Sequence, residues 1–249
     1  MLRRITWSLT GILATALLVS VSAFLVLGYT ESGARWILEH LPERIGKVSL
    51  KAEGFSGTLA GGFRLERFTL EHELVSLRIE RASGRLAMLP LLWQTIDAHD
   101  VRAEYARADI HRRKTPPPKR EPRFLPRFLT IVSDNIRVRK ADVTLINGFV
   151  LSGTNLRASG VARHKTIRFT DSDVALGALH GGGTLLLTAG EPMQLEGETR
   201  WRWAPEGQPA WVATADVDGD LDRLPASVRV TSPMRASAEG ELLTLTKAW

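Results

Sequence analysis

The sequence has no cysteine, which excludes disulfide bonds, iron–sulfur clusters and thiolate zinc sites. It also has no P-loop and no Gly-x-Gly-x-x-Gly motif, and its six histidines are scattered without metal-ligand spacing. His180-Gly181-Gly182-Gly183 matches an oxyanion motif of lipases, but no Gly-x-Ser-x-Gly elbow accompanies it, so we interpret it as a glycine hairpin. The sequence therefore predicts no catalytic residue, no metal site, no cofactor and no enzymatic activity.

The excess of positive charge is confined to one segment. The chain has 33 Lys and Arg against 27 Asp and Glu, but seven of the basic residues and one acidic residue lie between Arg112 and Arg127. The other 26 basic and 26 acidic residues balance, so the rest of the chain has no general excess of the kind typical of nucleic-acid binding. Five prolines between Thr115 and Pro126 favour an extended, solvated linker, whose charge could also attract anionic lipid headgroups.

Charged residues are also missing between Arg4 and Glu31. Ile5–Leu27 is a run of 23 mainly apolar residues, and a helix of that length reaches about 34 Å, enough to cross a hydrocarbon core of about 30 Å. Arg3 and Arg4 precede the run, so the positive-inside rule predicts a cytoplasmic N-terminus and export of the remaining chain. The alternative is a signal peptide cleaved after Ala23, although the run is longer than the usual apolar core of such peptides.

A short amphipathic helix is expected next, within residues 31–46. Apolar residues recur there at helical spacing, Thr30 or Ser32 can cap the first turn, and Pro42 should end the helix. The helix either covers the end of the following fold, which we favour, or lies on the lipid surface.

From Lys47 onward the hydrophobic pattern has period two, which predicts strands with one dry face and one wet face. The clearest runs are Met193–Trp203 and Trp211–Leu221, and the aspartates of the second run fit a wet strand face better than a calcium-binding loop. One helical turn is expected at Pro90, where proline suits the first helical position.

An apolar pattern with spacing n, n+2, n+5, n+7 and n+9 occurs three times. The step of three reverses the alternation, so a bulge must lie there if all five residues share a face. The copies are Ile96, Ala98, Val101, Ala103 and Tyr105; Ile136, Val138, Ala141, Val143 and Leu145; and Ile167, Phe169, Ser172, Val174 and Leu176.

These patterns predict a mainly β protein with a single N-terminal transmembrane helix, a short amphipathic helix and a curved or solenoid-like sheet. The expected segments are an anchor over 1–30, the amphipathic helix over 31–46, a first β segment over 47–113, a proline-rich basic linker over 114–127 and a second β segment over 128–249.

The dry face of this sheet either packs against a second sheet or lines a groove for acyl chains. Many of its residues are glycine or alanine, which leave space that a packed sandwich would have to fill, so we favour the groove. Transfer of a 16-carbon chain through water costs near 13 kcal/mol, and an apolar groove would remove most of that barrier. The candidate lipid-groove residues are Val75, Leu77, Ile79, Ile136, Val138, Val143, Leu145, Met193, Leu195, Trp201 and Trp203.

The order of several short motifs resembles the N-terminal part of the TamB-like proteins of the AsmA-like superfamily. TamB itself is the inner-membrane subunit of the translocation and assembly module. After the apolar N-terminal run, the matching motifs are Gly57-Thr58-Leu59-x-x-Gly62-Phe63-x-Leu65, Leu89-Pro90-Leu91-Leu92-Trp93, Phe124-Leu125-Pro126, Val138-x-x-x-x-Val143, Gly181-Gly182-Gly183-Thr184-Leu185-x-Leu187 and Pro192-Met193-x-Leu195.

The resemblance implies a single-pass protein of the bacterial inner membrane whose taco-like periplasmic β-sheet forms an apolar groove that moves phospholipid toward the outer membrane. It implies, as an alternative, a scaffold for outer-membrane protein insertion or autotransporter secretion. Membrane lipids are then the expected partners, with an outer-membrane Omp85-family protein as a possible partner through a C-terminal region missing here, and nucleic acid is not expected. TamB-like proteins are normally much longer than 249 residues, so the chain is expected to be a fragment or a truncated copy.

Overall fold

The computed structural model describes residues 22, 26–40, 44–45, 48–72, 75–111, 123–144, 148–190, 192–221 and 223–243. Most of the anchor predicted over Ile5–Leu27 lies outside these residues. Among the described helices, none combines the length and apolar character needed to cross a bilayer.

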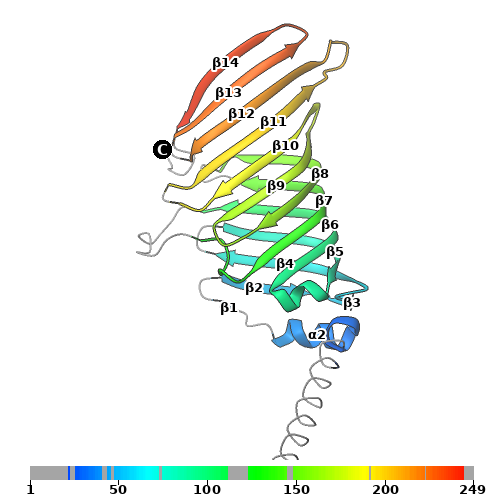
Figure 1. Cartoon of the computed structure of the whole chain (residues 1–249). Helices are drawn as coiled ribbons and strands as arrows, with labels where there is room; N and C mark the ends of the chain where they lie inside the picture. The colour runs from blue at the N-terminus through cyan, green and yellow to red at the C-terminus, as the bar shows by residue number, and fades with distance from the viewer. Residues whose placement is uncertain are drawn as a thin grey trace, which may run out of the picture.

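The described chain forms one open, curved β-sheet with α2 (Glu31–His40) at one end (Figure 1). The first strands are β1 (Arg44–Ile45), β2 (Val48–Glu53), β3 (Ser56–Thr58), β4 (Gly62–His72), β5 (Val75–Ala87) and β6 (Thr95–Ile110). They are followed by β7 (Thr130–Thr144), β8 (Val150–Ala162), β9 (Thr166–Leu176), β10 (Leu179–Thr188), β11 (Gln194–Trp203), β12 (Trp211–Asp220), β13 (Arg223–Ser232) and β14 (Ala236–Leu243). The strands lie in chain order from β1 to β14, except β3, which pairs only with β4.

All neighbouring strands are antiparallel except β6 and β7, which are parallel. Thr130 pairs with Thr95, so the chain must return from Ile110 along the whole length of β6, about 50 Å at 3.3 Å per residue. The twenty Cα steps from Ile110 to Thr130 can reach about 66 Å when extended. The long proline-rich linker is therefore a crossover within one continuous sheet, because parallel neighbours cannot be joined by a tight turn.

The amphipathic helix contacts the end of the sheet beside β3, in keeping with the covering role that we favoured. Thr30 caps it as expected, because its Oγ1 accepts a hydrogen bond from the backbone N–H of Gly33 at 3.1 Å. The backbone N–H of Ala60 donates to Gly28 O at 3.1 Å, and the buried Met88 side chain fills the space where Gly28 has none. The helix ends at His40 and β1 begins at Arg44, earlier than the expected boundary at residue 46.

Several strands reverse their alternation at bulges, which confirms the step of three in the repeated pattern. Asp100, Asn155 and Asp171 have φ values of 50°, 54° and 50°, and short polar side chains tolerate this left-handed conformation best. The ladder shifts register beside Asp100 and Asp171. One extra residue inverts the direction of every later side chain in the strand. Apolar residues separated by a step of three across a bulge therefore share one face.

Two expectations are wrong, and a third is confirmed. The glycine triplet after His180 lies inside β10 and is not a hairpin, since the turn falls at Gly177-Ala178. Tyr105 does not share the face of Ala103, because β6 reverses its alternation a second time and the Tyr105 hydroxyl donates to Asp142 Oδ2 at 2.8 Å. The turn at Pro90 is confirmed as the 3-10 helix η1 (Leu89–Trp93), with proline in its first turn.

Candidate functional site: the apolar face of the sheet

One face of the sheet is apolar from β2 to β14, and we call it the apolar face. Paired residues on neighbouring strands lie side by side on the same face, so the register traces rows across the sheet. One such row is Ala103, Val138, Leu156, Val174, Gly181, Trp201, Ala213, Val230 and Ala236, in which the step from Leu156 to Val174 falls at a register shift between β8 and β9. The row consists only of aliphatic, glycine and tryptophan residues.

Among the described residues that have a register partner, no Asp, Glu, Lys or Arg lies on the apolar face between β4 and β14. Its only polar members in these strands are His72, Ser133, Ser172 and Thr199. Acidic and basic residues instead occupy the alternate positions, which form the polar face. In β11 the alternation is complete, with Leu195, Gly197, Thr199, Trp201 and Trp203 on the apolar face and Gln194, Glu196, Glu198, Arg200 and Arg202 on the polar face.

The apolar face is not covered by a second layer of described residues. Each strand contacts its neighbours in the sheet, and no large described side chain is less than 2% exposed. Several large apolar residues of this face remain open to solvent, including Phe169 at 37%, Leu151 at 44% and Trp203 at 45% exposure. The filled-sandwich alternative therefore does not describe this part of the chain.

Glycines let large side chains lie flat on the neighbouring strand. A Cβ at Gly181 would overlap the Trp201 ring, and one at Gly160 would lie 3.3 Å from Phe169 Cδ1. Gly153 is similarly covered by Val174, whose Cγ2 would lie 2.9 Å from a Cβ. These pairs keep the face continuous without a second layer.

The structure brings the described candidate residues onto this one face. Val75, Leu77 and Ile79 come from β5. Because β5 pairs with β6 and β6 pairs with β7, the register extends the same face from these residues to the candidates of β7. The remaining described candidates are Ile136, Val138 and Val143 on β7 and Leu195, Trp201 and Trp203 on β11, with Met193 directly before β11. Leu145 lies outside the described residues. Their role in lipid binding stays a prediction.

Sequence reasoning missed part of the same face. Phe63, Leu65, Phe68 and Leu70 of β4 show the same step of three, which could have been found by searching for the repeated pattern further toward the N-terminus. Leu156 and Leu151 of β8 lie on this face as well, but Asn155 between them reverses the alternation and hides the period of two.

The polar face holds networks of titratable groups at the bulges between β6 and β7. His99 Nδ1 lies 2.8 Å from Asp134 Oδ2, and this hydrogen bond raises the pKa of His99 above 6.5 and lowers that of Asp134 below 3.8. Asp142 accepts hydrogen bonds from Ser152 and Tyr105, which lower its pKa. These groups share hydrogen bonds but are open to solvent, and they lie on the face away from the apolar surface.

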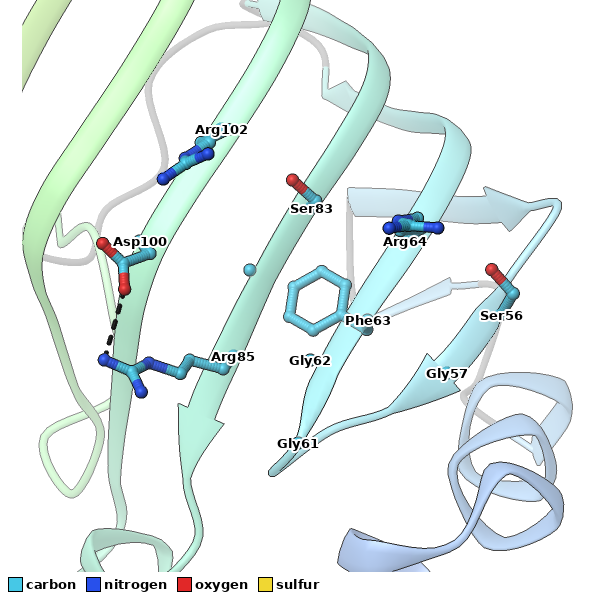
Figure 2. A pocket seen from close by; sticks show the side chains of 11 residues that line it. Ser56, Gly57, Gly61, Gly62, Phe63, Arg64, Ser83, Arg85, Asp100 and Arg102 are labelled. Carbon is cyan, nitrogen blue, oxygen red and sulfur yellow. Dashed lines mark ion pairs between the residues drawn. The ribbon is translucent and has the colours of Figure 1, made fainter.

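Two hollows among the described residues are lined mostly by residues of the polar face, with Phe63 contributing to one and Trp201 to the other from the apolar face. The first is lined by side chains from β3 to β6, including Arg64, Ser83 and Arg102 (Figure 2). In it Arg85 forms an ion pair with Asp100, with Nη2 and Oδ2 3.2 Å apart. The second is lined by Asp173, Gly182 and Arg200 among others. Both are shallow and open, so neither resembles an enclosed small-molecule pocket.

No family model matches the chain, and no curated protein or solved structure matches it either.

Proposed function

We propose that the chain is a non-enzymatic protein of the bacterial inner membrane whose apolar face carries phospholipid acyl chains through the periplasm toward the outer membrane. The observation that supports this proposal best is the apolar face itself. It runs across neighbouring strands without a charged residue, and no described layer covers it.

The size of the apolar face argues for an occupant. Thirteen strands in one path, about 4.8 Å apart, make a sheet roughly 58 Å long. With strands of about ten residues, or roughly 30 Å, the face covers on the order of 1,700 Å². The largest apolar patch of an ordinary monomer measures about 300–600 Å². A surface this large stays soluble only if something apolar covers it, and acyl chains would gain about 0.8 kcal/mol per buried CH₂.

The uncharged rows run across the strands, and therefore along the length of the sheet, away from the end that α2 occupies. The apolar run Ile5–Leu27 lies N-terminal to α2, so an anchor in that run would place this end of the sheet beside the membrane. Acyl chains that leave the bilayer could then move from strand to strand without meeting a charge.

The proposal is tested by placing a charge on each face in turn. Leu195→Asp with Val143→Asp puts two carboxylates on the apolar face, and Gln194→Asp with Thr184→Asp puts two on the polar face of β11 and β10. Phospholipid retained by the purified full chain is measured by mass spectrometry. The lipid held by the predicted anchor is the same in both variants, so any difference reports on the sheet.

We expect the first pair of substitutions to remove the phospholipid that the second pair retains. Equal phospholipid in both variants and in the wild type would contradict the proposal. In that case the expected alternative, a scaffold for outer-membrane proteins, would be examined by crosslinking unfolded barrel proteins to the sheet edges.

A further inference from the structure

The polar face carries a row of arginines at matched register positions. Each member of the row pairs directly with the next member on the neighbouring strand. From β4 to β13 the row consists of Arg64, Ser83, Arg102, Arg137, Arg157, Asp173, Gly182, Arg200, Thr214 and Arg229. Six of these ten residues are arginine and one is acidic, so the row is strongly basic within a face of mixed charge.

A recurring local sequence builds the centre of this row. In β6, β7 and β8 the arginine follows a short polar residue by two positions, as Asp100-Val101-Arg102, Asn135-Ile136-Arg137 and Asn155-Leu156-Arg157. The polar residue lies at a bulge or in a left-handed conformation, and the middle residue points to the apolar face. The arginine must then point to the polar face, because alternate residues of a strand face opposite ways.

The three central arginines lie side by side, and none of them forms an ion pair with a described carboxylate, although Asp173 is the direct neighbour of Arg157 in the row. Arg102 pairs with Arg137, and Arg137 pairs with Arg157. The one hydrogen bond that the structure gives their side chains runs from Arg137 Nε to Asn135 Oδ1, at 3.0 Å. Like charges directly opposite one another on neighbouring strands destabilise a sheet, so this arrangement weakens the fold unless an anion neutralises it.

Nearby arginines of the same face do have acidic partners. Arg67 Nη1 lies 2.8 Å from Glu53 Oε2, and Arg78 Nη2 lies 2.7 Å from Glu80 Oε1. Arg107 Nε lies 3.0 Å from Asp109 Oδ1. These three arginines are therefore neutralised by acidic residues of the chain, whereas the structure shows no such ion pair with a described residue for Arg102, Arg137 or Arg157.

Both hollows lie on this row. Arg64, Ser83 and Arg102 line the first, and Figure 2 shows them in line across β4, β5 and β6. Asp173, Gly182 and Arg200 line the second, where Gly182 contributes no side chain to fill the surface. Space for a ligand therefore exists at both ends of the three central arginines.

We propose that Arg102, Arg137 and Arg157 bind phosphate groups on the polar face. A guanidinium presents a planar set of N–H donors that matches two oxygens of one phosphate. Neighbouring strands are about 4.8 Å apart, so a phosphate can accept hydrogen bonds from two adjacent arginines at once. The phosphate comes either from the free anion or from a phospholipid headgroup. This site is on the opposite face from the apolar surface and does not depend on the proposed lipid role.

The test compares the full-length wild type with three variants, two of which lose three positive charges at different positions. The row variant is R102Q/R137Q/R157Q, and the control R163Q/R168Q/R235Q removes three exposed arginines outside the row. Binding of inorganic phosphate, pyrophosphate and glycerophosphoglycerol, the deacylated headgroup of phosphatidylglycerol, is measured by calorimetry at low salt. A third variant, R102K/R137K/R157K, keeps the charge but removes the planar donor set.

We expect the wild type and the control to bind at least one probe with affinities within threefold of each other, and the row variant to bind at least tenfold more weakly. Tighter binding of glycerophosphoglycerol would assign the phosphate to a lipid headgroup, and tighter binding of the inorganic anions would assign it to the free form. The lysine variant should fall between the wild type and the row variant. Equal weakening in the row variant and the control, or no saturable binding by the wild type, would overturn the proposal.

Discussion

The ring of Trp201 on β11 lies flat over Gly181, its direct partner on β10. A side chain at Gly181 would occupy the volume of the ring, and Trp201 Nε1 is fixed by a hydrogen bond to Thr199 Oγ1 at 2.9 Å. This pair shows how the apolar face is made continuous. Glycine on one strand supplies the space that a large side chain on the next strand fills, and no second layer is required.

Gly181→Ala should therefore destabilise the sheet by about 1–3 kcal/mol, because the added methyl group must displace the indole ring. The control is Gly240→Ala, at a position where a Cβ would meet no atom within 4 Å. Urea unfolding followed by tryptophan fluorescence measures both. A Gly181→Ala protein as stable as Gly240→Ala, with unchanged emission, would show that Trp201 does not lie over Gly181.

The His99–Asp134 pair predicts a specific pH dependence of stability. The hydrogen bond to Asp134 raises the pKa of His99, an effect that Asp97 reinforces and Arg85 opposes. A raised pKa in the folded protein stabilises the fold fully below the ordinary value of 6.5, and this contribution disappears as the pH rises through the folded value. The lowered pKa of Asp134 stabilises the fold above 3.8 and is lost at more acidic pH.

His99→Gln should therefore cost more stability at pH 6 than at pH 8, by no more than about 1 kcal/mol because the pair is open to solvent. Thermal unfolding at the two pH values measures this difference in stability cost. Asp134→Asn should remove the same pH-dependent contribution, because it removes the other partner of the hydrogen bond. A titration of the His99 ring by NMR that gives a pKa at or below 6.5 would contradict the assignment.

The parallel pairing of β6 and β7 makes the length of the crossover critical. Deletion of residues 113–120 leaves twelve Cα steps between Ile110 and Thr130, which reach about 40 Å and fall short of the 50 Å that the pairing needs. Replacement of the same eight residues by glycine and serine keeps the length and serves as the control.

Because the chain has no cysteine, a disulfide between neighbouring strands can report the pairing without side reactions. Ala103→Cys with Val138→Cys should form a disulfide in the control and not in the deletion variant, since these residues are direct partners. Disulfide formation in both proteins would mean that the crossover does not set the register.

Local patterns in the sequence were enough to predict the β character of the chain, the reversals of alternation in β6, β7 and β9, and much of the composition of the dry face. Ile167 to Leu176 shares one face across the bulge at Asp171, as the step of three required. The turn at Pro90 and the cap at Thr30 were also predicted correctly, because both depend on residues close together in the chain.

Properties that depend on strand pairing could not be obtained in the same way. The copies that begin at Ile96 and Ile136 suggest an offset of 40 residues, but the ladder pairs Ile96 with Ile131, an offset of 35. The arginine row exists only in that register, so no local pattern revealed it. The glycine triplet of β10 was misassigned to a turn because the partner that requires its first residue, Trp201 over Gly181, is 20 residues away.

The central claim is that acyl chains occupy the apolar face, and the most direct measurement scans a photo-crosslinking residue along β12, far from α2. Positions 213, 215 and 217 lie on the apolar face, and positions 212, 214 and 216 lie on the polar face. With the full chain in its native membrane, we predict phospholipid adducts at the first three positions and none at the second three. Adducts of equal yield at all six positions, or none at position 213, would contradict the account.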